Sequence, residues 1–240
     1  MLQLIALGAA ILCGAAMQRV TGMGFALIAA PFLVLVLGVA NGVPLVQVLS
    51  LCASALVLAS AFKHVEWRKA ALLIPPGLVG ILPGWWISKH MPTGPLSILI
   101  GVLVIVALLA MVADRRARIF KGTAGALSAG FLSGFMNVTA GVGGPAIVLY
   151  SLSTGWRHVE FVATAQAYFV ALNIASLMAQ GWPRLDGATW SLSFASLAAG
   201  LGLGEVLAKR VPTKVAKVLV IGIALAGAAA TIVRGSMALH

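Results

Sequence analysis

The chain has 240 residues, of which 61% are hydrophobic and only 9% are charged, and its mean hydropathy is +1.08. Soluble domains carry about 25% charged residues, so this composition excludes a soluble globular protein and indicates a membrane protein. The net charge of +11 does not indicate nucleic-acid binding, because the basic residues are spread among the connections between apolar segments.

Apolar segments follow one another along the chain with short breaks between them. A helix needs about 20 residues to cross the hydrocarbon core of a bilayer, and most segments approach this length. They cover approximately residues 2–17, 25–40, 44–62, 70–88, 95–113, 122–136, 144–155, 161–181, 188–208 and 214–233. We therefore expect an all-α polytopic membrane protein with roughly eight to ten membrane segments.

The two halves of the chain resemble each other. The most hydrophilic connection, "DRRARIFKG", lies near the middle, and a shift of 119 to 120 residues aligns many positions on either side of it. The shift places Met17-Gln18 on Met136-Asn137, Gly22 and Gly24 on Gly141 and Gly143, Gln47 on Gln166, Gly80 and Gly84 on Gly200 and Gly204, and Lys89 with Pro92 on Lys209 with Pro212. We predict a first transmembrane repeat over 1–113, a basic cytoplasmic linker over 114–121 and a second repeat over 122–240.

The charges of the connections indicate that the repeats are inverted. Connections rich in Lys and Arg stay cytoplasmic, and these are 63–69, 114–121 and 209–217. The counterpart of 63–69 in the second half, 184–186, is weakly charged and is expected outside. Two inverted repeats of about five helical segments each need an odd number of crossings per half. The first two segments of each half therefore either both cross or form a re-entrant hairpin, and the sequence leaves both open.

Each half contains a glycine-rich break inside apolar sequence, "MQRVTGMGFALIAAPF" at 17–32 and "MNVTAGVGGPAIVLY" at 136–150. Broken helix at membrane depth is tolerated only where protein or a water-filled cavity surrounds it. Two such breaks at equivalent positions of inverted halves indicate the substrate site of a transporter. The helix that restarts after each break offers free N–H groups and a positive dipole end, which attract anions.

The candidate substrate-binding residues lie at these breaks and on the helices that follow. They are Gln18, Arg19, Thr21, Gly22 and Gly24 at the first break, Asn137, Thr139, Gly141, Gly143 and Gly144 at the second, and Gln47, Gln166 and Asn173 on the following segments. We expect the backbone N–H groups to coordinate the anion, Arg19 to attract it from a distance, and Gln47 and Gln166 to add lateral hydrogen bonds. Asn173 is a further candidate because the shift places it on Ser54.

Each feature also has a purely structural interpretation. Glycine breaks also serve as packing surfaces, and Gly80, Gly84, Gly200 and Gly204 are small residues at the spacing of helix-packing faces. Arg19 could extend to the lipid headgroups. Both glutamines could hydrogen-bond neighbouring helices.

Other chemistry finds little support in the sequence. Acidic residues lie in or beside the connections, apart from Glu205 near a segment end, so no carboxylate relay at the membrane midplane is present. The four histidines have no nucleophile near them in sequence, and Cys13 and Cys52 lie inside apolar segments. We expect no cofactor, no metal and no catalysis.

The stretches "QRVTGMGFALIAAPF" and "GFMNVTAGVGGPAIVLY" resemble the paired signatures of the sulfite exporter TauE/SafE family, the toluenesulfonate uptake permease superfamily. The resemblance covers essentially the whole chain. It implies a multi-pass permease of the bacterial inner membrane that moves small sulfur-containing anions, such as sulfite, thiosulfate, sulfoacetate or other organosulfonates. The expected partners are a small anion and membrane lipid, with no nucleic acid.

Several points stay open at this stage. The substrate, the direction of transport and the coupling ion differ within the family, and the sequence leaves open whether the protein forms a homo-oligomer. The alternatives to an anion permease are a carrier of a cation or neutral metabolite, and a non-transporting membrane enzyme or partner subunit.

Overall fold

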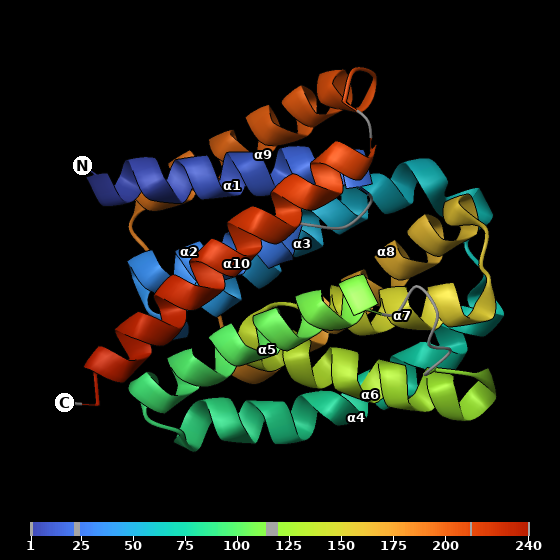
Figure 1. Ribbon diagram of the computed structural model, residues 1–240, viewed down its shortest axis with the longest axis horizontal. Coiled ribbons are helices and arrows are strands. Elements are labelled where there is room, and N and C mark those ends of the chain that lie inside the picture. Colours follow the sequence, from blue (N-terminus) through green and yellow to red (C-terminus); the bar gives the residue numbers. More distant parts are fainter. Residues whose placement is uncertain (1, 22–24, 114–119, 212, 240) are drawn as a thin grey trace.

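The computed structural model describes residues 2–21, 25–113, 120–211 and 213–239, and the regular structure of these residues is entirely helical. The helices are α1 (Leu2–Thr21), α2 (Phe25–Leu37), α3 (Val39–Ala61), α4 (Trp67–His90), α5 (Thr93–Ala113), α6 (Gly122–Ala140), α7 (Gly144–Thr154), α8 (His158–Gln180), α9 (Gly187–Ala208) and α10 (Thr213–Met237), with a short 3-10 turn at Phe62–His64. Each α-helix overlaps one of the apolar segments expected from the sequence. They lie roughly along the long axis of the molecule (Figure 1).

Six helices in the described part of the chain are long and apolar enough to cross a membrane, namely α3, α4, α5, α8, α9 and α10. Three of them belong to each half of the chain. By contrast, α2 has 13 residues and α7 has 11, which corresponds to about 20 and 16 Å of helix against a hydrocarbon core of about 30 Å. These two helices are too short to cross.

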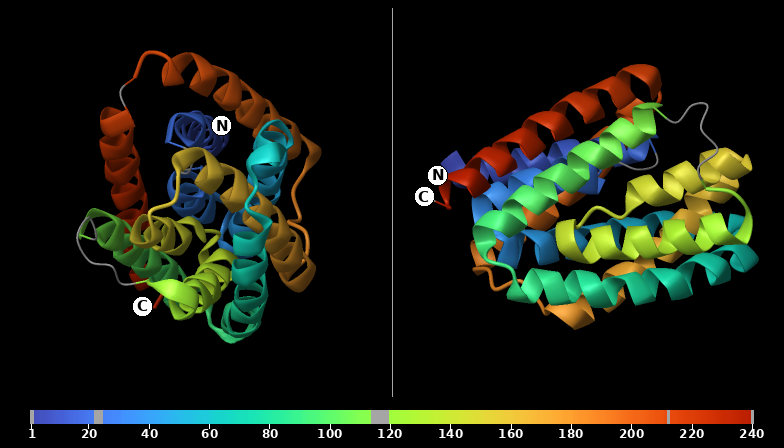
Figure 2. Two further views of the ribbon diagram at one scale, coloured as in Figure 1. Left: turned by 90° about the vertical axis from the view of Figure 1, so that its right-hand side faces the viewer. Right: turned by 60° about the horizontal axis from the view of Figure 1, so that its bottom comes forward.

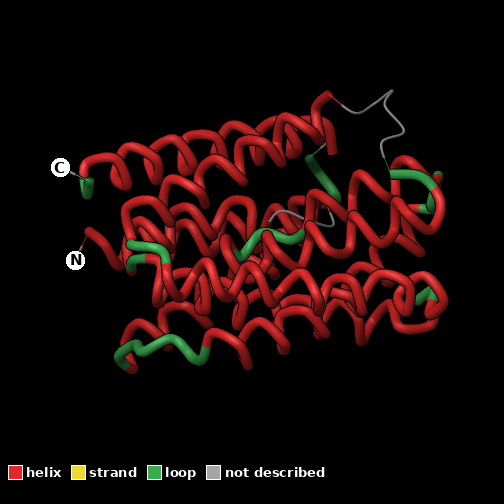
Figure 3. Tube along the Cα trace, turned by 90° about the horizontal axis from the view of Figure 1, so that it is seen from below, coloured by secondary structure: helices red, strands yellow, loops and turns green. Residues whose placement is uncertain are grey.

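The first two helices of each half form a hairpin. In Figure 1, α1 begins at the left and α2 returns toward the left, whereas α6 begins at the right and α7 returns toward the right. Figure 3 shows the loop between α6 and α7 away from both ends of the bundle. In both halves these two helices run antiparallel to each other, and the two hairpins begin at opposite ends of the bundle.

Each hairpin packs against a long helix of the other half, α1 on α9 and α6 on α4. Viewed end-on, α1 and α2 lie inside the arc formed by α9 and α10 (Figure 2, left). A Cβ added to Gly200 on α9 would lie 2.5 Å from the carbonyl oxygen of Leu12, and one added to Gly80 on α4 would lie 2.1 Å from that of Phe131. Leu12 and Phe131 are equivalent under the sequence shift, so glycine permits the same close helix contact twice.

The buried side chains form two main apolar clusters. One surrounds the first hairpin and includes Ile28 and Leu45, and the other surrounds the second hairpin and includes Ile147 and Tyr168. The outer faces of the long helices instead expose large apolar side chains, among them Leu82, Val106, Leu109 and Val218. Apolar side chains on both the inside and the outside suit a helix bundle that lipid surrounds.

Candidate functional site

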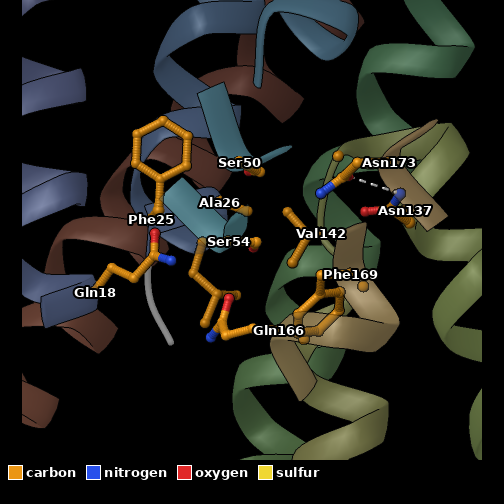
Figure 4. Close-up of a pocket in the computed structure, with 14 residues that line it drawn as sticks. Gln18, Phe25, Ala26, Ser50, Ser54, Asn137, Val142, Gln166, Phe169 and Asn173 are labelled. Carbon is orange, nitrogen blue, oxygen red and sulfur yellow. Dashed lines mark hydrogen bonds between the residues drawn. The ribbon is translucent and has the colours of Figure 1, made fainter. Parts of the chain in front are cut away.

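A cavity of about 50 Å³ lies where the two hairpins meet α3 and α8 (Figure 4). One water molecule needs about 10–15 Å³ on this measure, so the cavity has room for a few waters or for one small anion. The lining residues are Gln18 on α1, Phe25, Ala26 and Leu27 on α2, Ser50 and Ser54 on α3, Asn137 on α6, residues 141–144 at the α6–α7 break, and Gln166, Phe169 and Asn173 on α8.

The two halves contribute equivalent positions to this lining. The sequence shift that relates the halves pairs Gln18 with Asn137 and Ser54 with Asn173, and both members of each pair line the cavity. The same shift pairs Phe25 with Gly144 and Ser50 with Phe169. The cavity is therefore built from matching places in the fold, but its two sides differ in side-chain size.

Two helices begin at the cavity. The first residues of α2, from Phe25 onward, line it, and so does Gly144, the first residue of α7. No side chain caps the start of α7, and Pro145 in its first turn has no N–H to offer. The N–H groups of a first helical turn have no partner within the helix, and the helix dipole adds a positive potential there. An anion between two such starts would be stabilised from both sides.

The α6–α7 break is held in a defined conformation. Gly141 has φ 72°, a left-handed value that favours glycine, and its N–H donates to the carbonyl of Asn137 at 2.9 Å. The hydroxyl of the buried Ser133 donates to the carbonyl of Gly143 at 2.6 Å. These contacts fix the position from which α7 starts.

Asn137 is the centre of a buried hydrogen-bond network. Its Nδ2 donates to Oδ1 of Asn173 and to Oγ of Ser176, both at 3.1 Å, and the first of these bonds is drawn in Figure 4. Its main-chain carbonyl accepts a hydrogen bond from Nε2 of Gln47 at 3.0 Å. Gln47 is fully buried and lies behind Asn137, outside the cavity lining. The network joins α3, α6 and α8 at the tip of the second hairpin.

Several polar atoms at the cavity have no hydrogen-bond partner in the structure. These are Oε1 of Gln18, Oε1 of Gln166 and Oγ of Ser50. Gln18 is 7% exposed and Gln166 is 2% exposed, so bulk water does not satisfy them. An unsatisfied buried polar atom costs about 1–3 kcal/mol. At this cavity these atoms are available to hydrogen-bond a polar occupant, either water or ligand.

The structure brings together seven of the expected site residues as cavity lining, namely Gln18, Asn137, Gly141, Gly143, Gly144, Gln166 and Asn173. Thr139 does not line the cavity, because its hydroxyl donates to the carbonyl of Phe135 and its methyl group lies against α4 near Gly84. Gly22 and Gly24 lie outside the described residues. Arg19 and Thr21 belong to α1, but their side chains are not described.

Sequence reasoning missed the lining residues Phe25, Ala26, Leu27, Ser50, Ser54, Val142 and Phe169 as parts of the site. A signal existed for the two serines, because they lie three and seven residues after Gln47, on the same face of α3. Gln166, Phe169 and Asn173 have the same spacing on α8. No corresponding signal distinguished Phe25 from an ordinary core side chain.

The described lining residues carry no charged side chain. The described residues also contain no cluster of His, Cys, Asp and Glu able to hold a metal ion. The described lining thus offers amides, hydroxyls and main-chain N–H groups. These groups can bind a small polar solute although none of them carries a fixed charge.

Comparisons with known proteins agree with this picture. The family model described as sulfite exporter TauE/SafE matches residues 6–231, which is most of the chain. Neither the curated proteins nor the solved structures gave a match. The chain therefore belongs to the sulfite exporter TauE/SafE family and is a multi-pass membrane transporter of sulfite or related anions.

Proposed function

We propose that the protein is a permease of the bacterial inner membrane that carries a small sulfur-containing anion by alternating access. Sulfite, thiosulfate, sulfoacetate and other small organosulfonates are the candidate substrates. The observation that carries this proposal is the meeting of two helix starts, from hairpins that begin at opposite ends, at one polar cavity whose described lining carries no charged side chain. Membership of a transporter family also implies that the protein is not an enzyme.

The proposed architecture is a pair of inverted repeats, 1–113 and 122–240, joined by a basic cytoplasmic linker at 114–121. Three long spans follow each hairpin, and an odd number of crossings inverts the second repeat. The α3–α4 and α9–α10 connections, which are basic, lie at one end of the bundle, and the α8–α9 connection lies at the other (Figure 1). By the positive-inside rule the first of these ends is cytoplasmic.

Alternating access requires one group of helices to move against another around the site. The glycine contacts join α1 to α9 and α6 to α4, so each hairpin is fixed to a helix of the other half. We propose that these two pairs move as rigid units. Relative movement of the units would open the cavity to one side of the membrane and then to the other.

The rival functions fit the site less well. A cation would meet the positive ends of two helices and no described carboxylate, so electrostatics disfavours a cation carrier. A neutral metabolite could accept hydrogen bonds there but would gain no charge–dipole attraction from those helix starts. A membrane enzyme would need a nucleophile, an acid–base pair or a metal cluster, and the described cavity lining supplies only amides and hydroxyls as reactive side chains.

The test is flux through the purified protein in liposomes, measured for sulfite, sulfate, thiosulfate and short organosulfonates with and without a pH gradient. The informative variant is Gly144→Val, because a Cβ on this lining residue meets no atom within 4 Å and the side chain would occupy the cavity. Gly143→Val is less clean, because its Cβ would lie 2.9 Å from the hydroxyl of Ser133 and displace the loop.

The matched control is Gly222→Val on α10, which has equally open space and does not line the cavity. We expect flux of at least one sulfur anion in the wild type and the control, and none in Gly144→Val at an unchanged melting temperature. Wild-type flux in Gly144→Val, or no flux above empty liposomes with folded protein present, would contradict the proposal.

A further inference from the structure

The cavity that the proposed function uses has a polar lining whose described residues carry no charge, and this bears on the charge of the anion that it can bind. Its described lining is polar but uncharged, with Gln18, Ser50, Asn137, Gln166 and Asn173 among its polar side chains. Within the described lining, an anion is stabilised by dipoles and hydrogen bonds, and no fixed cation contributes. The cost of removing an ion from water and its gain from such dipoles depend differently on its charge.

The dehydration cost rises with the square of the charge, so a dianion costs about four times as much to transfer as a monoanion of the same size. Its attraction to fixed dipoles rises only in proportion to charge, by about twofold for the same geometry. Two helix starts and a few amides therefore balance the dehydration of one negative charge far better than that of two. A neutral dipolar cavity favours the monoanion.

The hydrogen-bonding groups at the cavity also favour a monoanion that carries a proton. Both hydrogens of the Asn137 amide are donated within the protein, to Asn173 and Ser176. Gln18 and Gln166 meanwhile leave their Oε1 atoms without a donor at the cavity. An anion that still carries a proton can donate it to one of these oxygens while its other oxygens accept from the helix N–H groups. A fully deprotonated dianion has no hydrogen for these oxygens and can only accept hydrogen bonds from the Nε2 groups of the same amides.

We propose that the site binds singly charged oxyanions and that sulfite is carried as hydrogensulfite, HSO₃⁻. This inference rests on the proposed function and narrows its candidate substrates, because thiosulfate and sulfoacetate carry two charges at neutral pH and would be excluded. The proton then travels on the substrate. Hydrogensulfite that dissociates to sulfite and H⁺ after release acidifies the side of arrival, and no covalent step or proton path within the protein is needed.

Titration of the protein itself does not account for such a preference. The titratable residues on the helices that line the cavity are Cys13 and Arg19 on α1, Cys52 on α3, Tyr150 on α7, and His158, Glu160 and Tyr168 on α8. None of them is among the described lining residues. Arg19 follows Gln18 directly on α1, so it is the charged residue whose effect must be tested.

The experiment compares the flux of three anions through the protein in liposomes over a series of pH values, equal on both sides. Methanesulfonate carries one charge throughout, sulfate carries two throughout, and sulfite changes from hydrogensulfite to the dianion near neutral pH. Flux through liposomes holding Gly144→Val is subtracted, which removes leakage of sulfur dioxide. We expect constant methanesulfonate flux, little sulfate flux, and sulfite flux that falls about tenfold per pH unit above the substrate's own titration.

Two variants refine the test. Gln166→Leu removes an acceptor for the proton of hydrogensulfite and should lower the ratio of sulfite to methanesulfonate flux about tenfold, the effect of one lost hydrogen bond. Arg19→Gln should keep the preference for a single charge, because we assign that preference to the uncharged lining.

The outcomes separate this inference from the proposed function. Sulfate flux equal to methanesulfonate flux, or sulfite flux that is constant or rises with pH, would overturn the charge selection alone. Loss of the preference for a single charge in Arg19→Gln would overturn the assignment of that preference to the uncharged lining. Absence of flux for every anion would overturn the proposed function together with this inference.

Discussion

The side-chain amide of Gln47 donates a hydrogen bond to the main-chain carbonyl of Asn137, with 3.0 Å between Nε2 and O. Gln47 lies on α3 of the first half, and Asn137 lies near the end of α6 in the second, so this bond joins the tip of one hairpin to the other half. Gln166, which the sequence shift pairs with Gln47, lines the cavity instead. Two equivalent glutamines therefore have different surroundings, so substituting one should affect transport differently from substituting the other.

Gln47→Leu should lower the flux of all transported anions alike, by on the order of tenfold, because the position of the second helix start depends on this bond. The ratio between sulfite and methanesulfonate flux should stay at its wild-type value. Gln166→Leu is the matched comparison, since it should change that ratio. A changed ratio in Gln47→Leu, measured in the same liposomes, would show that Gln47 contacts the substrate.

Ser133→Ala should destabilise the protein by about 1 kcal/mol, because it removes a buried hydrogen bond to the carbonyl of Gly143. Ser128→Ala, on the same helix, is the control, because Ser128 is exposed and bonds carbonyls of its own helix. Denaturant unfolding of the purified proteins in detergent measures both. Equal unfolding free energies for the two variants would mean that the loop does not depend on Ser133.

Gly134→Ala should destabilise the contact between α4 and α6 by about 1–3 kcal/mol or more, since the added Cβ would lie 1.9 Å from the carbonyl oxygen of Gly77. Gly202→Ala on α9 is the control. Its Cβ meets no atom within 4 Å, and alanine raises helix stability by about 0.5–1 kcal/mol over glycine. The melting temperature in detergent should fall for the first variant and hold or rise for the second. A fall in both would point to glycine-specific dynamics rather than packing.

Cysteine labelling tests the inverted arrangement separately from transport. In a background with Cys13 and Cys52 replaced by alanine, Glu66→Cys in the α3–α4 connection should react from the cytoplasmic side. Asp186→Cys in the α8–α9 connection should react from outside, because the two connections lie at opposite ends of the bundle. An impermeant maleimide applied to intact cells and to inverted vesicles distinguishes them. Reaction of both from one side would mean a parallel repeat.

The helices could largely be predicted from the sequence, because apolar segments alternate with polar breaks. The glycine breaks predicted Gln18, Asn137 and residues 141–144 except Val142 as candidate substrate-binding residues, and these residues line one cavity. The boundaries were less exact. The sixth segment was expected to end at 136, but α6 continues to Ala140, because Gly141 in its left-handed conformation is the residue that ends it.

Other features depend on packing that a single sequence does not encode locally. The first two segments looked alike in length, so the sequence left open whether they cross or form a hairpin. Gln47 and Gln166 differ only through their neighbours, since one meets the carbonyl of Asn137 and the other meets the cavity. Phe169 lines the cavity on an apolar helix whose other aromatic residues belong to the core. The rotation of a helix about its own axis determines which of its side chains face the cavity and which face the core.

The contact of α1 with α9 has a consequence for the order of synthesis. The carbonyl of Leu12 is covered closely by Gly200, a residue that leaves the ribosome only when most of the chain has been made. The second hairpin is different, because its partner α4 precedes it. The first hairpin is therefore synthesised before its packing partner α9 exists, whereas the second hairpin can pack against α4 as soon as it has been made. Residues 1–113 expressed alone would lack the surface on which α1 rests, and co-expression of residues 114–240 would supply it.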